Sequence, residues 1–252
     1  MRHYGAVSVG IVVTVLGVSL LASVAQSLTG FGFGLIVVPF LVLVLDVKDA
    51  VVISSVLGLA NVALLSLRVW RSVPWRTVTW LLVGSFAGMP LGLAVLVLAP
   101  QEALRLAVGV AAIVMAAALA TGLRLEARGA PSEVAVGVTS GILRTSTSMS
   151  GPPVVLYLQG RGHPPQEFRG ALTMYFLIGS LVSIGAFFGA EVVTGRALAL
   201  TAAALPSVYV GSWAGDRLLR RVDAALFRRI VLLLLVATAL SGVGSSIQRL
   251  LS

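Results

Sequence analysis

The sequence predicts an all-α integral membrane protein of two inverted-topology repeats, each a broken or re-entrant helical hairpin plus three transmembrane helices. Three observations support this fold class: a very apolar composition, long apolar runs with short polar connections, and an internal repeat whose loops differ in charge. We expect residues 1–252 to form a single transmembrane domain. One repeat covers about 5–123 and the other about 131–249.

The composition indicates that most of the surface faces lipid. Hydrophobic residues make up 58% of the chain and charged residues 11%, with a mean hydropathy of +1.04. Soluble domains carry about a quarter charged residues. The net charge of +9 would suggest nucleic acid in a soluble protein. Here the basic residues lie between apolar runs, so they indicate membrane orientation and no nucleic-acid partner.

The apolar runs define the expected elements in order. Only helices and closed barrels satisfy backbone groups in lipid, and these runs lack the alternation of barrel strands. The first run resembles a signal peptide, but we expect it to be retained because the chain continues directly into the repeated motif. The runs cover 6–28, 34–45, 50–67, 78–98, 103–123, 134–158, 171–189, 197–213 and 226–247.

Two pairs of segments indicate an internal duplication. Residues 26–39 align without gaps with residues 140–153, and both segments contain a small-residue break followed by proline. Residues 84–88 (GSFAG) match residues 211–215 (GSWAG). The agreement of order and spacing favours a duplication. The alternative is eight simple spans with a parallel repeat.

The distribution of arginine predicts the orientation. Loops 68–76 and 217–229 are the richest in arginine, so we expect both to be cytoplasmic. Counting spans from these loops places both ends of segment 133–159 in the cytoplasm. We expect its middle, residues 145–153, not to form a regular helix, which predicts a re-entrant hairpin and an inverted repeat. Whether the first segment spans or is re-entrant stays open.

The two breaks supply the candidate substrate-binding residues. Glycines let the backbone leave helical geometry and approach a ligand closely, and hydroxyls suit an oxyanion. We expect half-helices to begin near Gly34–Val38 and near Gly151, with free N–H groups from Ser148 to Gly151. Such N-termini at mid-membrane attract anions, although small residues also serve helix packing. The candidates are Gly30, Phe31, Gly32, Phe33, Gly34, Thr145, Ser146, Thr147, Ser148, Ser150 and Gly151.

Arg144 is the most specific single candidate. It lies about ten residues into the second hairpin, beside the hydroxyl cluster. A charge at the bilayer centre costs roughly 2.5–3.5 kcal/mol on insertion scales, so we interpret Arg144 as the countercharge of a bound anion. Snorkelling to an interface is the alternative. Further candidates, each of which also suits a hydrogen bond between helices, are Gln26, Asn61, Tyr157 and Tyr175.

Missing motifs exclude several other functions. The chain has no cysteine and two histidines, so we expect no metal site, and nothing in the sequence indicates a cofactor. No nucleophile–base pair or ATP-binding loop is present, which argues against an enzyme or an ATP-driven pump. Transport would then use a gradient, with H+ or Na+ as the candidate coupling ion. A homo-oligomer is compatible with the sequence.

The motifs around the two breaks resemble those of the TauE/SafE (TSUP) sulfite and sulfonate exporter family. The resemblance rests on SLTGFGFG at 27–34, five residues before Pro39, and on TSTSMSGPPVVLYL at 145–158. It implies a multi-pass permease of the bacterial inner membrane that handles sulfite, sulfoacetate or taurine-derived sulfonates. Many members have a fuller glycine run in the second repeat, where this chain has hydroxyls and Arg144.

These inferences lead to one function hypothesis and two alternatives. The hypothesis is a secondary transporter, an exporter, of a small organosulfonate or sulfur oxyanion. The anion would bind at mid-membrane between the half-helix N-termini of the two repeats, and alternating access would rock the repeats. The alternatives are a membrane scaffold or assembly factor without transport, and an anion-channel-like facilitator.

Overall fold

Helices joined by short connections make up the part of the protein that the computed structural model describes, residues 8–123, 125 and 128–218. This confirms the all-α prediction. The helices in that part are α1 (Val9–Thr29), α2 (Phe33–Leu41), α3 (Val47–Val69), the 3-10 helix η1 (Trp70–Ser72), α4 (Trp75–Leu98), α5 (Gln101–Ala120), α6 (Ala130–Thr147), α7 (Gly151–Gly160), α8 (Pro165–Gly189) and α9 (Gly195–Leu218).

Six of the described helices are long and apolar enough to cross a membrane: α1, α3, α4, α5, α8 and α9. The chain is therefore a multi-pass membrane protein. At 21 residues, α1 is long enough to span by itself, whereas α2 and α7 have only 9 and 10 residues. The expected last span at 226–247 and most of loop 217–229 lie outside the described residues.

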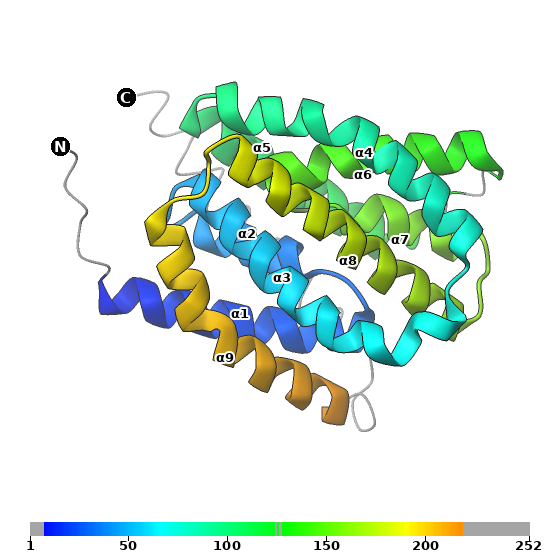
Figure 1. Cartoon of the computed structure of the whole chain (residues 1–252), viewed down its shortest axis with the longest axis horizontal. Helices are drawn as coiled ribbons and strands as arrows, with labels where there is room; N and C mark the ends of the chain where they lie inside the picture. The colour runs from blue at the N-terminus through cyan, green and yellow to red at the C-terminus, as the bar shows by residue number, and fades with distance from the viewer. Residues whose placement is uncertain (1–7, 124, 126–127, 219–252) are drawn as a thin grey trace.

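The helices form two closely packed pairs around a central group. The pairs α4/α6 and α1/α9 lie on opposite sides of α3 and α8, as Figure 1 shows. Glycines bring the backbones of each pair together. A side-chain carbon at Gly84 or Gly88 would overlap the backbone of α6 at Val134 or Val138. Such close approach between helix backbones is typical of membrane helices.

The α1/α9 pair repeats the contacts of the α4/α6 pair. A side-chain carbon at Gly211 would lie 2.6 Å from the carbonyl oxygen of Leu20, and one at Gly215 would lie 3.0 Å from that of Val24. Leu20 and Val24 each lie 114 positions before Val134 and Val138. The two matching five-residue segments therefore occupy corresponding interfaces, in the register of the ungapped alignment.

The contacts between helix ends fix the directions of the helices. Lys48, at the start of α3, donates to the carbonyl oxygen of Val97, at the end of α4 (3.1 Å). Asp49 accepts a 2.7 Å hydrogen bond from Thr194, just before α9. Because α4 ends where α9 begins, these two helices are antiparallel. Since α6 runs parallel to α4 and α1 parallel to α9, α1 and α6 also run in opposite directions.

Two expected boundaries differ from the structure. α6 remains helical through Thr147, so the prediction that residues 145–147 leave helical geometry was wrong. Their hydroxyls donate to carbonyl oxygens four residues earlier, which lets them stay in a helix. The ungapped alignment places the start of α2 opposite Gly151, the start of α7. In the structure α2 begins one turn earlier, at Phe33. The two helices continue for different lengths beyond the corresponding residues Val24 and Val138. α6 continues ten residues from Val138 to its cap, whereas α1 continues only six residues from Val24 to its cap.

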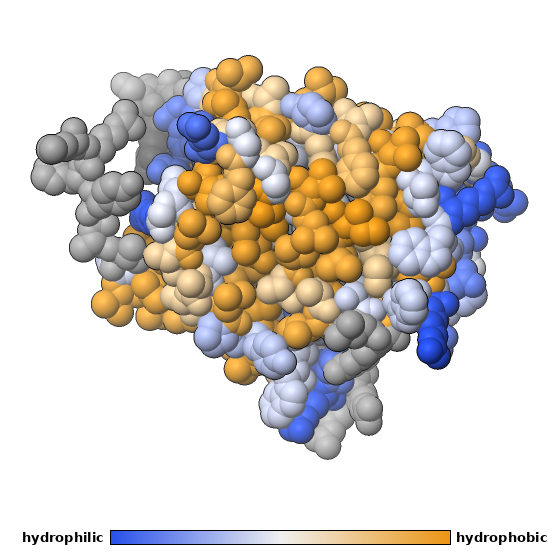
Figure 2. Space-filling model, in the orientation of Figure 1, coloured by the Kyte–Doolittle hydropathy of each residue, from blue (hydrophilic) through white to orange (hydrophobic). Residues whose placement is uncertain are grey.

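The outer surface suits a lipid environment. Figure 2 shows a broad hydrophobic area over the middle of the helices, with hydrophilic residues gathered toward the ends of the molecule. Large exposed apolar side chains include Leu91, Val114, Leu181 and Tyr209. An apolar surface of this kind is stable in a bilayer and would not be stable in water.

We expect Gly141→Ala to lower the thermal stability of the detergent-solubilised protein. The added carbon would overlap the backbone of Ser85 in the α4/α6 interface, and such overpacking costs about 1–3 kcal/mol. The matched control is Gly185→Ala, at an exposed helical position with no atom within 4 Å of the added carbon. Equal melting temperatures for the two variants would contradict the packing described above.

Candidate functional site

Two helix breaks define the centre of the molecule. The first separates α1 from α2 at Gly30–Gly32, where Gly30 and Gly32 have φ of 84° and 100°. The second separates α6 from α7 at Ser148–Ser150, and Ser148 has φ of 58°. A left-handed conformation costs a non-glycine residue about 1–2 kcal/mol. The second break therefore holds Ser148 in an unfavourable conformation that a glycine would adopt freely.

The two breaks contact each other. A side-chain carbon at Gly34, in the first turn of α2, would overlap the carbonyl oxygen of Ser148. A side-chain carbon at Gly151, the first residue of α7, would lie 3.6 Å from the Phe31 ring. Glycine at these positions lets segments more than a hundred residues apart in the sequence approach to backbone contact.

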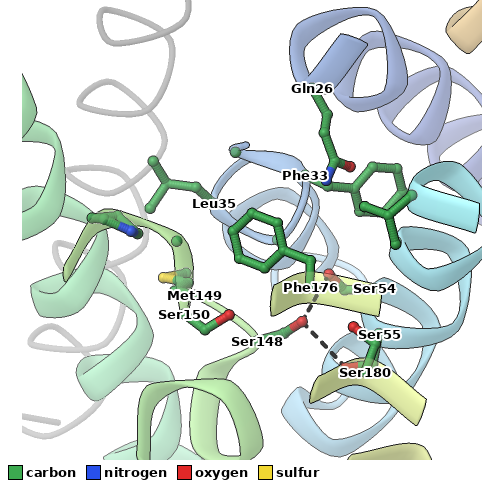
Figure 3. Close-up of a pocket in the computed structure, with 16 residues that line it drawn as sticks. Gln26, Phe33, Leu35, Ser54, Ser55, Ser148, Met149, Ser150, Phe176 and Ser180 are labelled. Atoms are coloured by element: carbon green, nitrogen blue, oxygen red, sulfur yellow. Dashed lines mark hydrogen bonds between the residues drawn. The ribbon is translucent and has the colours of Figure 1, made fainter. Parts of the chain in front are cut away.

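A cavity of about 50 Å³ lies beside the two breaks. One water molecule needs roughly 10–15 Å³ on the same measure, so the cavity has room for a few waters or one compact oxyanion. Figure 3 shows serine hydroxyls grouped on one side and Phe33 and Phe176 facing the same space. The lining residues are Gln26, Gly32, Phe33, Gly34, Leu35, Ser54, Ser55, Gly58, Val62, Ser148, Met149, Ser150, Gly151, Pro152, Phe176 and Ser180.

The cavity lies near the middle of the spanning helices. Ser54 and Ser55 are the eighth and ninth of the 23 residues of α3, and Phe176 and Ser180 are the twelfth and sixteenth of the 25 residues of α8. At about 1.5 Å per residue, each helix extends more than 10 Å beyond the cavity in both directions. If both helices cross the bilayer, the cavity is at mid-depth.

Serine hydroxyls supply polar groups to this cavity. The Ser148 hydroxyl is 3.2 Å from the hydroxyls of both Ser54 and Ser55. The Ser150 hydroxyl has no hydrogen-bond partner in the described part of the chain, while its carbonyl oxygen accepts a 2.6 Å bond from Ser140. Hydroxyls can donate or accept, so this side of the cavity can solvate an oxyanion.

The backbone amides at the breaks differ partly from expectation. The amides of Ser148 and Met149 donate to the carbonyl oxygens of Arg144 and Leu143, at 3.1 and 3.3 Å. The expectation that all N–H groups from Ser148 to Gly151 are free was therefore wrong, because the end of α6 is capped. Among the described residues, the amides of Ser150 and Gly151 have no backbone acceptor.

Arg144 is buried behind the cavity wall. Its side chain is 4% exposed, and one guanidinium nitrogen donates to the hydroxyl of Ser180 at 3.3 Å. The ring of Tyr175 lies 4.8 Å away and that of Phe176 5.7 Å away. Among the described residues, the Nε and the second terminal nitrogen have no hydrogen-bond partner, and no carboxylate pairs with the group. A buried cation without an anionic partner is energetically costly.

The remaining candidates lie around the cavity rather than in its wall. Gly30 and Phe31 belong to the first break but do not line the cavity, and neither do residues 145–147. Asn61 donates to the side-chain oxygen of Gln26 at 2.8 Å. Tyr157 donates to Glu133, and Tyr175 donates to the Ser140 hydroxyl. These two tyrosines are fully buried hydrogen-bonding residues.

Nine lining residues were not among the candidates predicted from the sequence, and four of them are polar or aromatic: Ser54, Ser55, Phe176 and Ser180. These four belong to the apolar runs that form α3 and α8. A polar pair inside an apolar run is the same signal that indicated Asn61, and it could have indicated Ser54 and Ser55. Nothing in the sequence distinguishes Phe176 from the other aromatic residues of its run.

Contacts near the cavity recur at a constant spacing of 118 positions. Gln26 contacts Asn61, and Arg144 contacts Gly179. Phe33 contacts Gly58 (3.4 Å to an added carbon), and Gly151 contacts Phe176 (3.5 Å).

A third pair, across the two halves, keeps this spacing. Gly30 contacts Leu172, and Ser148 contacts Ser54. The cavity thus lies among contacts that recur at this spacing.

Comparison with known proteins gives one consistent result. The profile of the family described as sulfite exporter TauE/SafE matches residues 15–242. The probable sulfite/organosulfonate exporter TauE of Cupriavidus necator is 26% identical over 231 residues, 88% of each chain. The probable inner membrane transporter protein TsaS of Comamonas testosteroni is 28% identical over 102 residues, 40% of this chain and 43% of that protein. No solved structure matches the chain.

We expect Gly34→Ala to separate the two breaks, because the added carbon would overlap the Ser148 carbonyl oxygen. Amides 148–151 should then exchange hydrogen for deuterium faster than in the unmodified protein. Gly17→Ala is the control, since position 17 is exposed on α1 with open space around the added carbon. Unchanged exchange at 148–151 in Gly34→Ala would show that the breaks do not touch.

Proposed function

The chain belongs to the sulfite exporter TauE/SafE family, and on this premise we propose that it is a secondary transporter that exports a small organosulfonate or sulfur oxyanion. The family is one of membrane transporters, and the chain is not an enzyme. The named relatives are described as an exporter of sulfite or organosulfonates and as an inner membrane transporter. We infer the same substrate class and the bacterial inner membrane for this chain.

The observation that carries the proposal is a buried guanidinium one hydrogen bond away from a hydroxyl-lined cavity. Arg144 donates to Ser180, and Ser180 lines the cavity. As an acceptor for Arg144, the Ser180 hydroxyl can direct its own proton toward an anion, and bonds in such a chain strengthen one another. An anion in the cavity would supply the negative charge that Arg144 does not find among the described residues.

The two half-helices add to the attraction for an anion. α2 and α7 both begin at the cavity, with Gly32 and Ser150 as their first flanking residues. Helix N-termini carry partial positive charge and unpaired amides. Because the two helices start from opposite breaks, an anion between them would experience both termini.

We propose an inverted-topology repeat as the basis of alternating access. Its support is threefold: the antiparallel course of α1 and α6, the corresponding glycine contacts of α1/α9 and α4/α6, and the contacts that recur 118 positions apart. Inverted repeats commonly hold the substrate between them and rock about it. The matching interfaces would then open in turn toward the two faces of the membrane.

The charges at the helix ends support a cytoplasmic location for loops 68–76 and 217–229. The end of the bundle that holds η1 also holds the start of α8, because Gly170 packs on Ser72. That end is rich in arginine, and cytoplasmic loops carry the excess of positive charge. Its arginines in the described residues include Arg71, Arg76, Arg161 and Arg169.

We expect Arg144→Gln and Ser148→Ala to lower the uptake of radiolabelled sulfite into proteoliposomes by about tenfold or more. Loss of a hydrogen bond to a charged group costs about 1.5–3 kcal/mol, which is on the order of ten- to a hundredfold in affinity. The initial rate of saturable uptake is the measurement, with sulfoacetate and sulfate as competing anions.

The matched controls make the same substitutions at positions that do not line the cavity. Arg76→Gln removes an exposed arginine, and Ser183→Ala removes a buried serine one turn beyond Ser180 in α8 that does not line the cavity. Both controls should retain uptake. Full uptake in Arg144→Gln and Ser148→Ala, or absence of saturable uptake in the unmodified protein, would refute the transport proposal and favour a scaffold role.

A further inference from the structure

Gln26 and Arg144 hold corresponding positions in front of the two breaks. The carbonyl oxygen of Gln26 accepts the amide of Gly30, the cap of α1, at 2.7 Å, and that of Arg144 accepts the amide of Ser148, the cap of α6, at 3.1 Å. Both side chains are almost fully buried, at 3% and 4% exposed. The two halves therefore present one neutral and one cationic side chain from the same place.

The partners of these two side chains also correspond. Asn61 donates to Gln26, whereas the position 118 residues later is Gly179, where an added carbon would lie 2.6 Å from the guanidinium carbon of Arg144. The Asn61 bond occupies the Gln26 oxygen, so the Gln26 amide nitrogen keeps its donors for the cavity. Gly179 leaves the space that the larger arginine head requires.

The two side chains differ in one respect. Gln26 lines the cavity, whereas Arg144 lies behind Ser180 and Phe176 and does not. We propose that Arg144 is a state-dependent ligand that enters the cavity in the opposite-facing state, in which Gln26 withdraws. This inference rests on the transport function proposed above and concerns how that same site changes between its two states.

The physical reason for this proposal is that the two repeats exchange conformations between the two states. When two equivalent halves adopt two different conformations, the opposite-facing state is reached if each half takes the conformation of the other. The half that now presents Gln26 then buries it, and the half that now buries Arg144 presents it. The anion meets a carboxamide in one state and a guanidinium in the other.

A difference in affinity between the two membrane faces follows. A hydrogen bond to a charged donor is stronger than one to a neutral amide, so the state that presents Arg144 binds an anion more tightly. The face to which that state opens should have the lower KM. A site of this kind captures the anion on one side and releases it more easily on the other.

The test is the KM for radiolabelled sulfite, measured on right-side-out and on inside-out membrane vesicles. We expect the two KM values of the unmodified protein to differ by about tenfold or more. In Arg144→Gln both halves present a carboxamide, so the two values should become equal. In the exchanged variant Q26R/N61G/R144Q/G179N, the lower KM should move to the opposite face.

Two outcomes would overturn the inference while leaving transport intact: equal KM values at both faces of the unmodified protein, or an undiminished difference in Arg144→Gln. Absence of saturable uptake in either type of vesicle would refute the transport proposal itself, and this inference with it. Because Arg144→Gln alone tests the inference, it stays testable if the exchanged variant does not fold.

A second measurement does not depend on transport. The chain contains no cysteine, so Q26C and R144C each carry a single thiol. We expect a membrane-impermeant thiol reagent to modify Q26C from one face of the membrane and R144C from the other. Modification of both variants from the same face would contradict the exchange of roles. Gly17→Cys, exposed on the outer surface of α1, is the control for labelling outside the cavity.

Discussion

The close approach of Gly34 to the Ser148 carbonyl is the contact on which the centre of this protein depends. It holds two interrupted helices together at a point where neither can complete its hydrogen bonds alone. Unpaired backbone groups are costly in a membrane and persist only where they are buried in protein or line a cavity. Glycine at position 34 permits the contact, and the contact in turn places both half-helix starts beside one small cavity.

The second constraint is electrostatic. Arg144 is buried, has two nitrogens without a partner and has no carboxylate beside it in the described part of the chain. The rings of Tyr175 and Phe176 compensate for part of the lost hydration through cation–π contacts. The described residues do not compensate for the rest of the cost, and in the transport proposal a bound anion would do so. In the transport proposal, the same residue would account for both a local instability and a preference for negative substrates.

Much of this arrangement follows from the sequence, and the remainder has identifiable reasons. The long apolar runs determine the helices, and Gly151-Pro152-Pro153 determines where α7 begins. Thr145–Thr147 were expected in the break because hydroxyls usually disfavour helices, but their bonds to α6 carbonyls keep them helical. The range expected for the start of α2, Gly34–Val38, lies just after the observed start at Phe33, because an alignment cannot show that α6 continues four residues farther than α1 beyond corresponding contacts. Ser54 and Ser55 form a polar pair that the sequence shows, but Ser180 and Phe176 reach the cavity only through the packing of α8, which no local pattern indicates.

The most direct test of the account is the position of a bound heavy-atom analogue of sulfite. Selenite has the shape and charge distribution of sulfite, and its selenium is located by anomalous diffraction from crystals of the protein. We expect a selenium peak between the two breaks, within about 4 Å of the Ser148 hydroxyl, as for an oxyanion hydrogen-bonded at about 2.7 Å. A peak only at the helix ends, or a continuous helix through residues 148–150, would contradict it.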